Sequence, residues 1–250
     1  ALQPCRVQGQ GDQGVVAPWR PRVGVLRDGG ASPKDEGEAP TRWVGAPTMQ
    51  AWAGGLADGL DVRSGVSIAA CERADGGARL LDDEGRVAAT AERVGIATPA
   101  PQAATLLEGL DAELARAARA VTMAPTWTLL AEAPRPAAVP YDLLFVNDEG
   151  PLRVLARDSA KPGRPPGERW VAHATAAWSR SWLEASRPAV LAALLAAASQ
   201  ALGVSLTSAR AEVHRWRYAT PAVSEPPPRC LRGRGGAVAA AGDWTSAPRV

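Results

Sequence analysis

Hydrophobic residues recur with two different spacings along this chain, and the change of spacing predicts where strands and helices lie. Alternating or short apolar runs predict a strand over 15–26 that a proline interrupts, and then four short strands between residues 62 and 99. Glycine-containing turns at 75–77 and 83–85 make the first three of those four a meander. Further strands are predicted at 125–130, 143–147, 152–157, 169–175, 211–218 and 238–241.

Helical spacing appears in three segments. Residues 48–60 and 99–120 each carry apolar side chains on one side of a helix. Residues 186–202 are rich in alanine and leucine, begin at Ser186 ahead of Pro188, and end at Gly203, which are the usual start and stop signals. Residues 29–40 are expected to form a loop, and the polar segment 1–14 is expected to be poorly ordered.

Mixed strands and helices predict an α/β fold. The strand-rich block 62–99 stands apart from the block 121–219, and a short apolar strand follows near the end of the chain. A chain that leaves one sheet and returns to it would produce this order. We therefore expect two interleaved subdomains.

Composition excludes several classes of function. A formal charge of +2 with no dense basic run argues against a nucleic-acid partner, and no apolar run is long enough to cross a membrane. Cys5, Cys71 and Cys230 are widely spaced, which argues against a metal site or a disulfide framework and favours the cytoplasm. Abundant Ala, Gly, Pro and Arg are typical of a GC-rich bacterial source.

Three segments carry candidate chemistry. His173 lies in a strand, where a hydrogen-bonded sheet histidine is the favoured interpretation. Alternation places His214, Trp216 and Tyr218 on one face of the strand 211–218; that face either packs in a core or forms a wall for a flat aromatic ligand. The cationic segment 157–164 either binds a phosphate or carboxylate or is a solvated loop. The sequence contains no GxSxG motif or P-loop, and its one GxGxxG spacing, GQGDQG at 9–14, precedes a predicted strand and not a helix.

Four segments in one order resemble the renalase-like branch of the FAD-dependent amine oxidase superfamily. They are VVAPWRPRVGV at 15–25, ARDSAKPGR at 156–164, HRWRYA at 214–219 and AGDW at 241–244. Residues 44–62 and 94–107 are similar to two further segments of that family, a helix and a strand-to-helix return near the flavin. The resemblance implies a Rossmann-type FAD-binding part and a substrate part with a mixed or antiparallel sheet backed by helices.

The resemblance also assigns roles to residues. Those implied to contact FAD are Ile68, Thr98, Pro99, Gly242, Asp243 and Val250. Those implied to line the substrate side are Trp19, Trp43 and Lys161, together with His214, Trp216 and Tyr218 next to the reaction centre. The implied FAD-binding part spans 44–100 and 229–250, and the implied substrate part spans 15–43 and 101–228.

The implied reaction is hydride transfer from a small reduced substrate to FAD, which O2 reoxidises. A dihydronicotinamide isomer or an amine is the expected substrate, in a bacterial, cytoplasmic flavoprotein that needs no metal. The family begins with a strand–turn–helix unit whose GxGxxG turn binds the pyrophosphate. Residues 9–14, GQGDQG, fit the glycine spacing, but no strand is predicted before them and no helix after them, so this unit is not predicted here. We therefore expect weak FAD binding by a chain with cut ends, and a non-catalytic fragment or decayed homologue is the alternative.

Overall fold

The chain folds into two compact units, each made of two separate segments. The computed structural model describes residues 14–35, 41–207, 210–222 and 230–245. Unit 1 comprises residues 1–62 and 127–215, and unit 2 comprises 63–126 and 216–250. The boundaries that we predicted between the FAD-binding part and the substrate part lie elsewhere, at 43/44, 100/101 and 228/229. The division into an FAD-binding and a substrate part thus stays a prediction, while the α/β class is confirmed.

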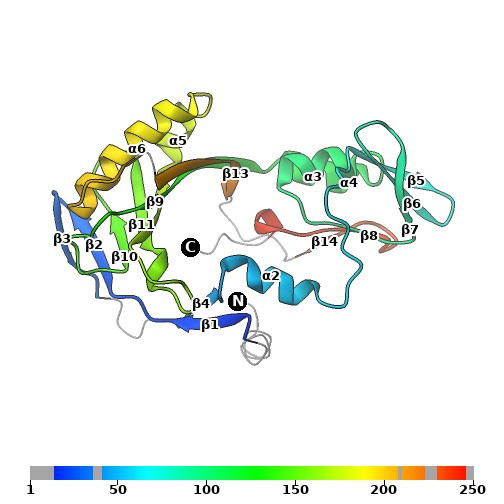
Figure 1. Ribbon diagram of the computed structural model, residues 1–250. Helices are drawn as coiled ribbons and strands as arrows, with labels where there is room; N and C mark the ends of the chain where they lie inside the picture. Colours follow the sequence, from blue (N-terminus) through cyan, green and yellow to red (C-terminus); the bar gives the residue numbers. More distant parts are fainter. Residues whose placement is uncertain (1–13, 36–40, 208–209, 223–229, 246–250) are drawn as a thin grey trace. The chain divides into compact units, whose positions relative to one another are not determined.

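Unit 1 is built on a mixed seven-stranded sheet (Figure 1). Strands β2 and β10 are parallel, whereas the pairs β2–β3, β10–β11, β11–β12 and β12–β9 are antiparallel. The order across the sheet is β13(Ala211–Ala222), β9(Thr122–Glu132), β12(Arg169–Ala174), β11(Leu152–Arg157), β10(Leu143–Val146), β2(Val23–Arg27) and β3(Gly30–Pro33).

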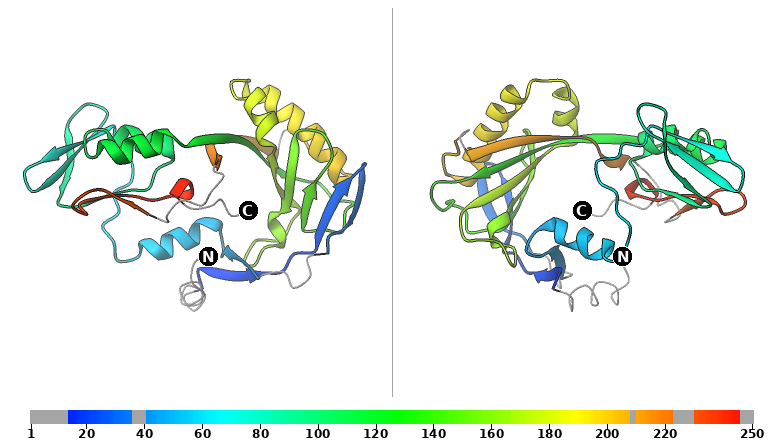
Figure 2. Two further views of the ribbon diagram at one scale, coloured as in Figure 1. Left: turned by 180° about the vertical axis from the view of Figure 1, so that it is seen from behind. Right: turned by 45° about the vertical axis from the view of Figure 1, so that its right-hand side comes forward.

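Two helices cover one face of this sheet, as both views of Figure 2 show. They are α5(Ala176–Ser181) and α6(Arg187–Leu202). The predicted signals of α6 are confirmed, because the Ser186 hydroxyl caps its first turn and Gly203 ends it in the left-handed region. Alternate strand residues such as Trp127, Leu155 and Trp170 are buried against the helix.

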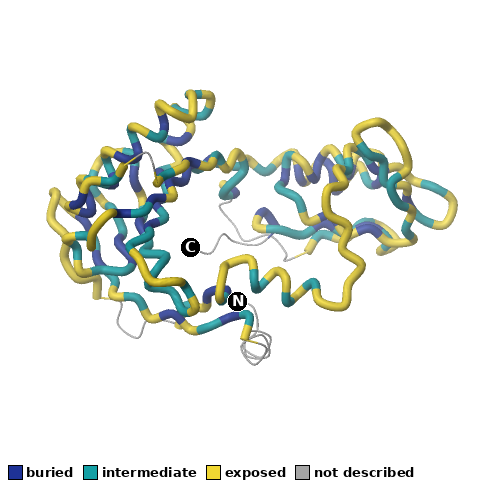
Figure 3. The backbone as a smooth tube through the Cα atoms, in the orientation of Figure 1, coloured by how far each residue is buried: buried dark blue, intermediate teal, exposed yellow. Residues whose placement is uncertain are grey.

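The opposite face, here called the second face, is covered over only part of its area. The strands β1(Val16–Trp19) and β4(Arg42–Gly45) pair with each other, and Trp19 and Val44 pack on Leu143 of β10. The helix α2(Met49–Ala57) follows β4 and contains no buried residue, as the burial colours of Figure 3 show. The part of the second face over β12, β9 and β13 carries the groove described below.

The described part of unit 2 contains two three-stranded sheets and two α-helices. The predicted meander is confirmed as β5(Ala70–Ala74), β6(Gly77–Leu81) and β7(Val87–Ala91). In the other sheet β15(Val238–Ala240) lies between parallel β8(Val94–Ile96) and antiparallel β14(Leu231–Arg232). The helices α3(Ala100–Leu107) and α4(Ala112–Arg119) pack their apolar faces against these strands.

Several predicted elements were wrong in extent. The single helix expected over 99–120 is two helices, because the Asp111 carboxylate accepts hydrogen bonds from the amides of Glu113 and Leu114 and begins α4 afresh. The expected loop 29–40 contains β3, and the interrupted strand 15–26 is β1 and β2, which join different sheets. Helix α5 and strand β4 were not predicted.

An ion pair between the exposed Arg22 side chain and the more buried Asp142 joins the starts of β2 and β10 in unit 1. The Asp142 carboxylate accepts two hydrogen bonds from the Arg22 guanidinium, at 2.9 and 3.0 Å, and one from the Arg22 backbone amide at 3.1 Å. Burial by itself raises the pKa of Asp142, but the Arg22 hydrogen bonds and nearby charges outweigh it and the pKa is lowered.

Within the described ranges, no helix is long and apolar enough to cross a membrane.

Candidate functional site

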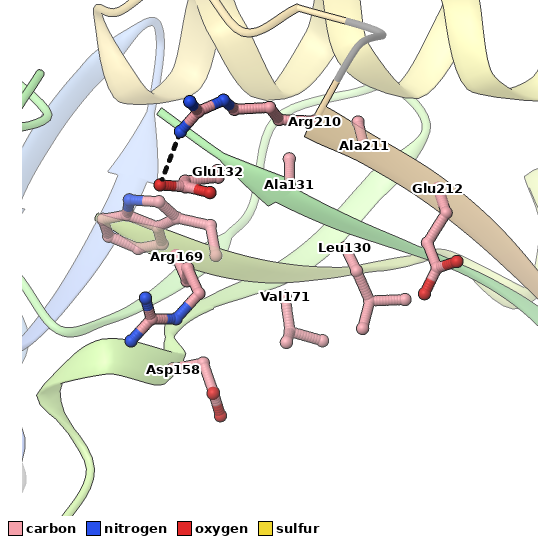
Figure 4. Close-up of a pocket in the computed structure, with 10 residues that line it drawn as sticks. Leu130, Ala131, Glu132, Asp158, Arg169, Val171, Arg210, Ala211 and Glu212 are labelled. Atoms are coloured by element: carbon pink, nitrogen blue, oxygen red, sulfur yellow. Dashed lines mark hydrogen bonds and ion pairs between the residues drawn. The ribbon is translucent and has the colours of Figure 1, made fainter. Parts of the chain in front are cut away.

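A groove of about 410 Å³ lies in unit 1 and is drawn in Figure 4. Leu130 of β9 and Val171 of β12 are direct cross-strand partners and form its apolar floor. Arg169 and Asp158 line one end of the groove, and Glu212 lies beyond the floor at the other end. The groove is large enough for a small organic ligand.

A cluster of charges lies next to the groove, in the segment whose cations the sequence singled out. Asp158 lies 3.0 Å from the Lys161 ammonium and 3.4 Å from Nε of Arg164. The two cationic side chains are only 12% and 6% exposed. Arg164 also donates to the carbonyl oxygens of Gly45 and Pro47, so it ties its loop to the segment after β4. This segment is therefore not a solvated loop.

Lys161 and Trp19, two of the predicted substrate-side residues, are close together. The Lys161 ammonium lies 5.7 Å from the centre of the Trp19 ring, within reach of a cation–π interaction. Trp43 lies elsewhere. It pairs across the strands with Pro18, whereas Trp19 pairs with Arg42, so the two indoles point to opposite sides of the β1–β4 pair. Trp19 is buried and Trp43 is 44% exposed.

His173 is a hydrogen-bonded sheet histidine, as the sequence predicted. Its Nδ1 atom lies 2.9 Å from the Thr128 hydroxyl on the neighbouring strand. Burial lowers the pKa of His173, and the positive charges of Lys161 and Arg153 lower it further. The imidazole is consequently neutral at physiological pH and is suited to hydrogen bonding rather than to ion pairing.

The strand β13 carries His214, Trp216 and Tyr218, and the boundary between the units falls between Arg215 and Trp216. Val213 packs in the core under α6, and Arg215 donates to the carbonyl oxygen of Leu183 on that side. Alternation therefore turns His214 away from α6, and it is exposed. Trp216 is 52% exposed and Tyr218 is half-buried. Their role as a ligand wall stays a prediction.

The predicted FAD residues of unit 2 gather at the carboxyl ends of the parallel strands β8 and β15. Gly242 has a φ of +153°, and the Trp244 indole donates to the Thr98 carbonyl oxygen at 3.0 Å. The Thr98 hydroxyl oxygen is buried and lacks a hydrogen-bond partner within the described part of the chain. Carboxyl ends of parallel strands are the usual place for ligands in α/β sheets.

The remaining predicted cofactor residues differ in their surroundings. Asp243 is exposed at the start of a short 3-10 helix, and Pro99 precedes α3. Ile68 lies ahead of β5 and its side chain packs against the unit 2 core, which leaves only its backbone for a ligand. Val250 lies outside the described residues.

These observations test whether FAD fits unit 2. The unpartnered Thr98 hydroxyl and the exposed Asp243 carboxylate are groups that suit the hydroxyls of a ribityl chain. They fit the flavin end of the dinucleotide. For the pyrophosphate, the described residues of unit 2 contain no GxGxxG turn.

Comparisons with known proteins support the fold at low identity. No protein-family model matches the chain. A "Putative protoporphyrinogen oxidase" from Exiguobacterium sp. 255-15 is similar with a TM-score of 0.51 and 20% identity, over 70% of this chain and 39% of that one. An oxidoreductase from Methanosarcina mazei is similar with a TM-score of 0.53 and 16% identity, over 78% of this chain and 48% of that one. The chain thus spans less than half the length of either neighbour, and the likeness shows the fold alone.

Sequence reasoning missed the groove and four of its charged residues, Glu132, Arg169, Arg210 and Glu212. Arg169 and Glu212 are single charges in strands, a pattern that usually indicates a solvated face. The available signal was alternation, which places Arg169, Val171 and His173 on one face of β12.

Proposed function

We propose that this chain is part of a flavin-dependent oxidoreductase, in which unit 2 holds the flavin end of FAD and unit 1 binds a small reduced substrate. The observation that carries the proposal is the pair of segments that follow β8 and β15, two parallel strands that end side by side. It combines a positive-φ glycine, an unpartnered buried hydroxyl and an exposed carboxylate. The fold likeness to two oxidoreductase structures and the motif resemblance agree with it.

The chemistry that FAD supplies when bound is acceptance of a hydride from the substrate, with O2 as the proposed final acceptor. Thr98 and Asp243 would hold the ribityl hydroxyls. A dihydronicotinamide or an amine is the substrate that the family resemblance favours.

In unit 1 the residues of the second face bind and orient the substrate. The Leu130–Val171 floor excludes water from an apolar ring, and the neutral His173 imidazole keeps its hydrogen bond to Thr128. Hydride transfer requires no protein base in principle, so these groups position the substrate and His214 orients it. The clustered cations Lys161 and Arg164 give this face a positive edge.

The proposal is tested by titrating FAD with the purified chain and following the fluorescence anisotropy of the flavin. A charge-assisted hydrogen bond contributes about 1.5–3 kcal/mol, so Asp243→Ala should weaken the dissociation constant by roughly tenfold or more. Asp83→Ala is the matched control, because Asp83 is an exposed carboxylate of the same unit. Equal affinity of wild type and Asp243→Ala contradicts the assignment, and lack of binding to wild type at millimolar FAD supports the non-catalytic alternative.

A further inference from the structure

The pairing of charges around the groove differs from what strand register alone predicts. Arg169 of β12 lies directly opposite Glu132 of β9, so the two side chains are cross-strand neighbours of opposite charge. Glu132 instead accepts a hydrogen bond from Arg210 at 3.0 Å, as Figure 4 shows. The cross-strand carboxylate is therefore already paired with another arginine.

Arg169 is held in place without being neutralised. Its guanidinium donates to the carbonyl oxygens of Pro165 and Pro166, the latter at 3.2 Å. Among the residues that the structure describes, it forms no ion pair with a carboxylate. Gly167 has a φ of +144°, and a Cβ atom there would lie 2.7 Å from Nη1 of Arg169. The glycine thus allows the loop to pin the guanidinium by its backbone alone.

The other charges of the groove are arranged so that one cationic end faces one anionic end. Asp158, at the Arg169 end, is shared by Lys161 and Arg164. Glu212 lies at the opposite end, beyond Leu130 and Val171, and is exposed. A ligand lying along the floor meets a guanidinium first and a carboxylate last.

We propose that this groove selects a small apolar, preferably planar ligand that carries one anionic group, a carboxylate, sulfonate or phosphate, which pairs with Arg169. An arginine fork with spare N–H donors suits such groups, and the Leu130–Val171 floor suits a ring. Glu212 disfavours a second anion at the far end and favours a hydrogen-bond donor there. As a statement about the substrate, this inference rests on the proposed function, while the binding itself requires no flavin.

Two naphthalene dyes that differ mainly in one sulfonate provide the test. They are 1-anilinonaphthalene-8-sulfonate, which is an anion, and N-phenyl-1-naphthylamine, which is neutral. Wild-type chain should bind the anion about tenfold more tightly than the neutral dye, as a charge-assisted pair predicts. Arg169→Gln should abolish this preference and keep the affinity for the neutral dye. Arg187→Gln, an exposed arginine at the start of α6, should leave both affinities unchanged.

Two further variants keep the test independent of how well Arg169→Gln folds. Leu130→Glu adds a negative charge to the floor and should weaken anion binding more than neutral binding, whereas Glu212→Gln should strengthen anion binding. An anion preference that survives in folded Arg169→Gln, or an equal loss of both dyes, overturns the proposal. Because no FAD is present, this result is separate from the flavin titration, and either can fail alone.

Discussion

The carboxylate of Asp158 holds together two nearly buried cations, and its removal tests the electrostatics of the candidate site. It lies 3.0 Å from the Lys161 ammonium and 3.4 Å from the Arg164 guanidinium. Asp158→Asn keeps the shape of the side chain but deletes its charge. Among the described residues, the Lys161 ammonium then keeps its contact with the Trp19 ring, and Arg164 keeps its hydrogen bonds to two backbone carbonyl oxygens.

The expected cost follows from burial. Breaking a buried ion pair costs about 3–5 kcal/mol, whereas an exposed pair contributes about 0–1 kcal/mol. Asp158 is 26% exposed, and asparagine still offers one oxygen acceptor. We therefore expect Asp158→Asn to lower the free energy of unfolding of unit 1 by about 2–3 kcal/mol.

Tryptophan fluorescence during urea unfolding measures this change in unit 1. Seven of the nine tryptophans belong to that unit, namely Trp19, Trp43, Trp52, Trp127, Trp170, Trp178 and Trp182. Glu149→Gln, an exposed acid of the same unit, is the control and should change stability by less than about 0.5 kcal/mol. Adding Lys161→Met to Asp158→Asn should recover about 1 kcal/mol, because one uncompensated charge disappears. A loss below about 1 kcal/mol, or no recovery in the double variant, refutes the reasoning.

Three other predictions concern titration and packing. In an NMR titration, His173 should ionise below the ordinary histidine pKa of about 6.5, and Lys161→Met should raise its pKa; an unchanged value contradicts the electrostatic cause. The pKa of Asp142 is lowered in the folded state, so its stabilisation is present above the unfolded pKa of about 3.9 and is lost as the pH falls. Acid unfolding of the Asn variant of Asp142 should accordingly depend less on pH in that range. A Cβ atom at Gly109 would collide with the Cys71 carbonyl oxygen, so Gly109→Ala should lower the calorimetric stability of unit 2 by about 1–3 kcal/mol, and an unchanged melting temperature rules out this crowding.

Local signals in the sequence predicted the elements that are stabilised locally. Ser186 and Gly203 bound α6 because capping depends on a few neighbouring residues. The single helix predicted over 99–120 was wrong because Asp111 caps a second helix. The apolar spacing continues across Asp111, so the spacing alone does not show the break. Giving the capping residue more weight than the apolar spacing predicts a break at Asp111.

The candidate site depends on contacts between distant segments, which spacing does not reveal. Nothing local indicates that Arg210 takes the carboxylate of Glu132 and leaves Arg169 to backbone carbonyls. Likewise, the strand pairing that turns Trp19 and Trp43 to opposite sides is set by register between two segments. Family resemblance pointed to Lys161 and Trp19, and the structure places them together.

Site-resolved NMR is the direct test of whether the two segments that follow β8 and β15 hold the flavin end of FAD. FAD is titrated into the chain labelled with 15N, and the shift of each backbone amide is followed, which also detects weak binding. We expect saturable shifts concentrated at residues 96–98 and 241–245, and smaller shifts in Asp243→Ala. Absence of shifts in these residues at millimolar FAD, or shifts confined to other parts of the chain, contradicts it.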